Sequence, residues 1–96
     1  MTDELRLDDF LPLLGQSLAI ECAGQRRTLE LKEVLPIDSP SPRQSPPFSL
    51  TLRASDGWRS EQGIFRLDHP QRGALDIFFV PIGPDGLGLC YQAVFN

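Results

Sequence analysis

The chain contains one histidine, and this residue is the first place to look for a catalytic or metal-binding side chain. His69 lies in the segment Asp68-His69-Pro70, and Asp76 follows a short distance later. A histidine beside carboxylates can act as a general base or bind a metal ion. A zinc site needs three or four ligands, and one histidine with two distant cysteines does not supply them. We therefore expect no metal ion and no cofactor, and interpret His69 as a turn residue beside a proline.

Serine and glycine motifs do not indicate an enzyme either. The sequence contains no G-x-S-x-G motif, which would place a nucleophilic serine on a sharp strand-to-helix turn. The glycines between Gly83 and Gly88 do not lie between a strand and a helix, as a phosphate-binding loop requires. We expect a protein that is not an enzyme.

Basic residues around Trp58 form the best candidate for a binding surface. Arg53, Arg59 and Arg66 would approach Trp58 if the strand that ends at Arg53 pairs with the strand that begins near Ile64. Such a patch suits an acidic protein surface or a carboxylate ligand. The alternative is a solvated strand face with Trp58 buried at a barrel end, as is common for tryptophan. The candidate binding residues are Arg53, Trp58, Arg59, Arg66 and His69.

The length and composition limit the classes of protein to consider. The 96 residues are 41% apolar and 23% charged, which predicts one globular domain over 1–96. The formal net charge of −4 disfavours nucleic acid and anionic membranes as partners. No basic start precedes an apolar run, and no apolar run is long enough to cross a bilayer. We therefore expect a cytoplasmic protein that does not bind membranes.

Alternation of apolar and polar residues predicts about six strands. The expected ranges are 16–23, 27–37, 48–53, 64–68, 75–82 and 89–95. A turn is expected at Gly24-Gln25, and a slip in the apolar phase predicts a bulge near Glu33. Strand 75–82 is apolar on both faces, which predicts a central strand covered on both sides. Strand 89–95 is expected to be an interior strand of the sheet.

The remaining segments have simple interpretations. Residues 1–8 form an acidic tail, and Asp8-Asp9 would cap a short helix that ends at Gly15. Its apolar stripe of Phe10, Leu13 and Leu14 is expected to dock on the sheet. Residues 38–47 are rich in proline and serine and predict an exposed loop. Cys22 and Cys90 are expected to be buried, unpaired thiols.

Strands joined by short links without intervening helices are typical of antiparallel sheets. The sequence therefore predicts an all-β fold, either a small barrel or a sandwich, with one short N-terminal helix.

Three blocks of sequence carry a resemblance to a known family. They are QGIF at 62–65, FVPIG at 79–83 and YQAVFN at 91–96. The chain resembles a family of small bacterial proteins of about this length, known only as a domain of unknown function. The resemblance implies a compact bacterial β domain and a setting among phage-tail-like proteins. It implies no activity, cofactor or catalytic residue.

Two functions remain open from the sequence. The first is a non-enzymatic protein-interaction or assembly module, with a protein partner or self-association. The alternative is a small-ligand-binding barrel or an unrecognised enzyme, with its site near Trp58, Arg66 and His69 at a barrel mouth. A filled interior would favour the first function, and a cavity would favour the second.

Overall fold

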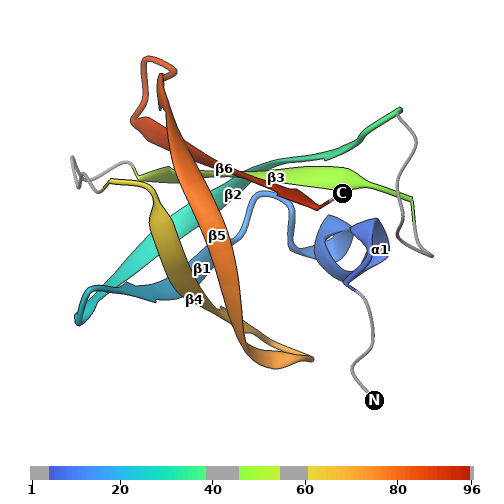
Figure 1. Cartoon of the computed structure of the whole chain (residues 1–96), viewed down its shortest axis with the longest axis horizontal. Helices are drawn as coiled ribbons and strands as arrows, with labels where there is room; N and C mark the ends of the chain where they lie inside the picture. Colours follow the sequence, from blue (N-terminus) through green and yellow to red (C-terminus); the bar gives the residue numbers. More distant parts are fainter. Residues whose placement is uncertain (1–4, 39–45, 55–60, 96) are drawn as a thin grey trace.

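A computed structural model describes residues 5–38, 46–54 and 61–95, and six antiparallel strands within them form a closed barrel (Figure 1). The strands are β1 (Ser17–Cys22), β2 (Gln25–Pro36), β3 (Phe48–Ala54), β4 (Gly63–His69), β5 (Gly73–Pro84) and β6 (Leu89–Phe95). Their order around the barrel is β1-β2-β3-β6-β5-β4. The all-β antiparallel prediction is confirmed, and closure decides between the barrel and the sandwich.

Each predicted strand is present, with small shifts at its ends. The turn between β1 and β2 lies one residue earlier than Gly24-Gln25, because Gln25 already pairs with Cys22. Ala23 and Gly24 form the two-residue connection, with φ angles of 52° and 79°. Positive φ at both central residues is the hairpin geometry whose twist matches that of the flanking strands.

The predicted bulge in β2 is confirmed. Leu31 pairs with Leu52 and Glu33 pairs with Thr51, so Lys32 is the extra residue of β2. After the bulge Val34 points inward and is buried, while Leu35 is exposed. A bulge bends and twists a strand, which lets the long strand β2 follow the wall of a narrow barrel.

The N-terminal helical segment begins and ends earlier in the sequence than predicted. It consists of α1 (Leu7–Phe10) and the 3-10 turn η1 (Leu11–Leu13). Arg6 is the N-cap residue, so the prediction of an aspartate cap is wrong. Asp9 instead lies in the first turn, where its carboxylate accepts a hydrogen bond of 2.7 Å from the backbone N–H of Arg6. This arrangement satisfies a helix-end donor and places negative charge at the positive end of the helix dipole.

The short helix covers one end of the barrel, as expected from its apolar residues. Phe10 and Leu13 are fully or almost fully buried, but Leu14 is 49% exposed, so the prediction that Leu14 docks is wrong. The ring of Phe10 lies 6.0 Å from that of Phe48 and 6.2 Å from that of Phe95. Phe48 and Phe95 stack on each other at 4.5 Å. These aromatic rings pack together at the end of the barrel beside α1. Figure 1 shows α1 next to the end of β6.

The middle of the barrel is filled by large side chains from several strands. Phe65 packs against Phe79 at 5.2 Å and against Tyr91 at 5.4 Å between ring centroids. All three residues have no exposed surface. Cys90 is buried, as predicted, but Cys22 is only half-buried, and no disulfide bond joins the two.

The prediction that β5 is covered on both faces is wrong. Ile77 and Phe79 point inward and are buried, but Phe78 and Ile82 on the opposite face are each 51% exposed. In a closed barrel every strand has neighbours on both sides, so no strand is central, and the described strands form a single layer. The interior position of β6 is confirmed, because β6 pairs with both β3 and β5.

Two other predictions can be compared with the structure only in part, because they include residues outside the described ranges. The acidic tail of 1–8 is shortened by α1, which begins at Leu7, and residues 1–4 lie outside the described residues. Most of the loop at 38–47 also lies outside them. Of its described residues, Asp38 and Pro46 are exposed, as predicted, but Pro47 is buried. The backbone N–H of Ile37 donates a 2.9 Å hydrogen bond to the carbonyl of Pro47.

The alternation of β5 can be tested with two adjacent phenylalanines. Replacing Phe79 with alanine leaves a cavity beside Phe65 and is expected to lower the free energy of unfolding by about 3–5 kcal/mol. Phe78→Ala is the matched control, since its ring is half-exposed on the outer face and its loss leaves no internal cavity. Urea denaturation of both variants measures the difference. Equal losses would contradict the inward and outward assignments of β5.

Candidate functional site

The barrel does not gather the predicted binding residues into one patch. The assumed pairing of β3 with β4 is wrong, because β3 pairs with β2 and β6, while β4 pairs with β1 and β5. Arg53 on β3 and Arg66 on β4 therefore belong to strands that are not neighbours. Trp58 and Arg59 lie outside the described residues.

Arg53 belongs to an ion-pair network on the outer surface. Its guanidinium donates to the carboxylate of Glu30 at 2.8 Å and to that of Asp85 at 2.6 Å. Asp85 begins the turn between β5 and β6, and it also forms an ion pair of 3.0 Å with Lys32. The Arg53 side chain is only 13% exposed to solvent, so little of it is available to bind a ligand. This arrangement attaches the β5–β6 turn to β2 and β3.

The carboxylate of Asp85 receives an unusual number of hydrogen bonds. Besides the two cations, the backbone N–H groups of Leu87 and Gly88 donate to it at 3.0 and 3.1 Å. The bond from Arg53, followed by those from Leu87 and Lys32, holds the pKa of Asp85 well below its usual range. Gly88 allows this turn to approach the wall, because a side chain at this position would collide with the carbonyl of Ala54.

Cys90 lies beside this network, where its surroundings do not favour a reactive thiolate. Its sulfur is 3.9 Å from the Lys32 Nζ atom. Burial, together with the nearby Asp85, raises the pKa of the Cys90 thiol despite the positive charges of Lys32 and Arg53. A thiol with a raised pKa is a poor nucleophile. We therefore interpret Cys90 as part of the packed wall.

Arg66 is held by a partner on the next strand. Its Nε atom donates to Asp76 at 3.0 Å, and both side chains are more than half-exposed. The bond from Asp76 also raises the pKa of Arg66. Arg66, Glu21 and Ala23 line a hollow of about 260 Å³ beside β4. An exposed ion pair of this kind adds little stability.

His69 is buried under α1, and both of its ring nitrogens have hydrogen-bond partners. Nδ1 accepts from the backbone N–H groups of Gln71 and Arg72 at 3.1 and 3.2 Å. Nε2 therefore carries the proton in the neutral ring, and it donates to the carbonyl of Asp9 at 2.7 Å. The ring also makes an edge-to-face contact with Phe10 at 5.3 Å. His69 thus attaches the helical segment to the end of β4.

The described residues contain neither a cluster of metal ligands nor a membrane-spanning helix. No group of three or more histidine, cysteine, aspartate or glutamate residues in 5–38, 46–54 and 61–95 could hold a metal ion. Over the same residues, no helix has the length and apolar character needed to cross a membrane.

The most distinctive surface is a set of exposed apolar side chains on β4, β5 and β6, which we call the outer apolar face. Ile64 and Phe78 pair directly across β4 and β5 and are 55% and 51% exposed. Val94 on β6 is 49% exposed. In the sequence, Phe78 and Val80 belonged to a strand that was expected to be covered on both faces, because periodicity cannot show what covers a face. The outer apolar face consists of Ile64, Phe78, Val80, Ile82 and Val94.

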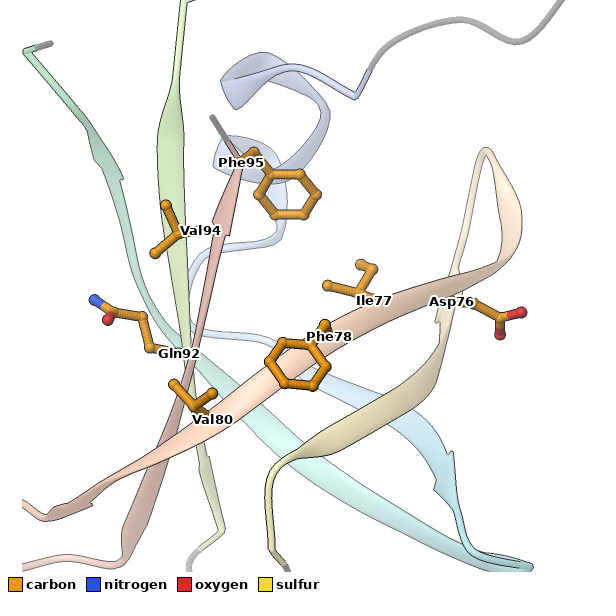
Figure 2. Close-up of a pocket in the computed structure, with 7 residues that line it drawn as sticks. All are labelled: Asp76, Ile77, Phe78, Val80, Gln92, Val94 and Phe95. Carbon is orange, nitrogen blue, oxygen red and sulfur yellow. The ribbon is translucent and has the colours of Figure 1, made fainter. Parts of the chain in front are cut away.

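A groove divides this face where two strands separate. β5 and β6 pair from Val80–Gln92 to Pro84–Leu89, and the described parts of the two strands have no pairing beyond Val80 and Gln92. Figure 2 shows the strands crossing near Val80 and Gln92 and moving apart toward Ile77 and Phe95. The groove has a volume of about 330 Å³, and Phe78, Val80 and Val94 are among its lining residues. Its lining is mainly apolar.

The chain matches a known protein family. A family model described as a domain of unknown function, DUF6916, matches residues 5–95. The chain therefore belongs to this family, which confirms the resemblance to a domain of unknown function. Comparisons with curated proteins and with solved structures found no match.

The network at Asp85 predicts a pH-dependent stability. The pKa of Asp85 is lowered by folding, so its contribution is present above about pH 4, where the carboxyl of the unfolded chain is ionised. The contribution is lost as the pH falls through the folded pKa. Asp85→Asn should therefore be less stable than the natural protein at pH 7, and this difference should narrow below about pH 4.

Urea denaturation at pH 7 and pH 3 measures this effect. Asp68→Asn is the control, because Asp68 also forms an ion pair, with Arg26, but both partners are well exposed. A difference between Asp85→Asn and the natural protein that does not depend on pH would contradict the electrostatic role of Asp85.

The hydrogen bonds of His69 predict a second effect on stability. His69→Ala leaves the carbonyl of Asp9 and two backbone N–H groups without their partner, and is expected to cost about 1–3 kcal/mol or more. Thermal or urea unfolding measures the loss, and tryptic cleavage after Arg6 should become faster as α1 loosens. Gln71→Ala, at a neighbouring exposed position, is the control. The same small loss in both variants would contradict the attachment role of His69.

Proposed function

We propose that this protein is a non-enzymatic interaction or assembly module whose contact surface is the outer apolar face. The single observation that carries the proposal is the exposure of adjacent large apolar side chains on the outer side of the single layer that the described strands form. Contiguous exposed apolar surface of this kind marks interaction sites on soluble proteins. The phage-tail-like setting and the cytoplasmic location stay predictions.

The energetics of burial support a contact role for these side chains. Full burial of a phenylalanine or isoleucine side chain contributes roughly 1.5–3 kcal/mol. In the free chain, about half of that free energy is still to be gained at Phe78 and Ile64, because each residue is more than half-exposed. A partner that covers them would gain on the order of 1 kcal/mol from each side chain.

The filled interior favours this function over the ligand-binding or enzymatic alternative near Trp58, Arg66 and His69. Phe65, Phe79 and Tyr91 occupy the middle of the barrel, where a small-ligand barrel would have its cavity. His69 is engaged through both ring nitrogens, and Arg66 is paired with Asp76.

Affinity capture from the cells that encode the chain tests the proposal. A tagged natural protein should retain a stoichiometric protein, which mass spectrometry identifies and which binds again as a purified component. Phe78→Ser should reduce capture at least tenfold, since a hot-spot aromatic commonly contributes 2 kcal/mol or more. A folded Phe78→Ser variant that captures the same protein equally well would contradict the role of the face.

Leu87→Ser is the matched control for this experiment. Leu87 is also an exposed apolar residue, at 68%, but it lies in the β5–β6 turn, outside the outer apolar face. Capture by Leu87→Ser should equal that by the natural protein. An untagged copy of the same chain counts as a captured protein, so self-association also satisfies the proposal.

A further inference from the structure

We propose that the partner covering the outer apolar face is a second copy of the same chain, packed across a two-fold axis near Phe78. This inference rests on the proposed function and names its partner. Three properties of the face support it: its charge, its area and its shape along the strands.

The charge of the face allows it to contact itself. A two-fold contact places the same patch on both partners, so a patch with a net charge repels its copy. The formal net charge of the chain is −4, but among the described residues of the outer face, the charges nearest to Phe78 are those of Arg66 and Asp76. These two form an ion pair of 3.0 Å, so their charges offset each other beside Phe78, while Glu21 lies farther away, on β1 beside Arg66.

The exposed area is sufficient for a small homodimer. Five large side chains, most of them about half-exposed, present on the order of 400 Å² of apolar surface, within the range of the largest patch on a monomer. Two copies would bury about 800 Å² of apolar surface. Since homodimer interfaces are about 65% apolar, the total interface would be roughly 1,200 Å². This value lies at the lower end of the range for specific interfaces, which predicts a dimer that dissociates on dilution.

The arrangement along the strands also suits a symmetric contact. Phe78 lies between Ile64 on β4 and the groove toward β6, and Val80 follows it on the same face of β5. The exposed Ile82 comes next, at the shift in register between Pro81 and Gly83. A two-fold axis near Phe78 would place the two rings at the centre of the contact and direct apolar side chains of one copy toward the groove of the other. The central aromatic would then be the residue whose loss weakens the dimer most.

Sedimentation equilibrium of the purified, full-length protein from micromolar to millimolar concentration tests the inference. The natural protein should change reversibly from monomer to dimer over this range. Phe78→Arg should raise the dissociation constant at least tenfold, because it places two like charges at the axis. Leu87→Arg should leave the dissociation constant unchanged. A natural protein that stays monomeric, or a Phe78→Arg variant that dimerises equally well, overturns the inference.

A photo-reactive phenylalanine analogue at position 78 tests the same contact without adding a charge. Illumination of the purified protein should produce a dimer whose cross-links join position 78 to residues of the outer apolar face. The same analogue at position 87 should give at least tenfold less dimer. Cross-links from position 78 to other faces overturn the inference, even if Phe78→Arg does not fold.

The same cross-linking in cells separates this inference from the proposed function. A cross-link between two copies supports both. A cross-link from position 78 to a different protein, together with a purified chain that stays monomeric, overturns self-association but leaves the interaction function standing. No cross-link and no dimer would contradict both.

Discussion

The packing of Phe10 against Phe48, Phe95 and His69 closes the barrel at the end where β5 and β6 separate. The two strands stop pairing at Val80 and Gln92, so strand hydrogen bonds alone do not close this side of the wall. The short helical segment covers this end of the barrel with the ring of Phe10. A helix of this length is not stable alone, and the hydrogen bond from His69 to Asp9 holds it in place. The N-terminal segment and the end of β4 are therefore interdependent.

This closure separates the residues needed for folding from those available for contact. The inward aromatic residues fill the barrel, and the network of Arg53, Asp85 and Lys32 attaches the β5–β6 turn to the wall. Ile64 and Phe78 belong neither to the packed interior nor to this ion-pair network, yet they place apolar surface on the outside of the barrel. Exposed apolar residues are an aggregation hazard for a β protein, so a contact function explains their presence better than folding does.

Local patterns in the sequence predicted the strands because alternation and turn chemistry are local properties. The phase slip at Glu33 even located the bulge. Strand order is a long-range property, and assuming that β3 pairs with β4, its successor in the chain, led to the wrong juxtaposition of Arg53 and Arg66. The alternation of β5 identified the apolar residues on both faces, but only the structure shows that the described strands form a single layer with Phe78 on its exposed side. His69 was interpreted as a turn residue, and nothing local indicated its contact with Asp9.

Methyl-resolved NMR spectra of the purified protein over a dilution series would test most directly whether the outer apolar face is a contact surface. The methyl signals of Ile64, Val80 and Val94 should shift with concentration, while those of Leu29 and Leu50 in the core stay constant. Shifts that are absent at every concentration, or that occur at Leu87 and not at the outer apolar face, would contradict self-association through this face.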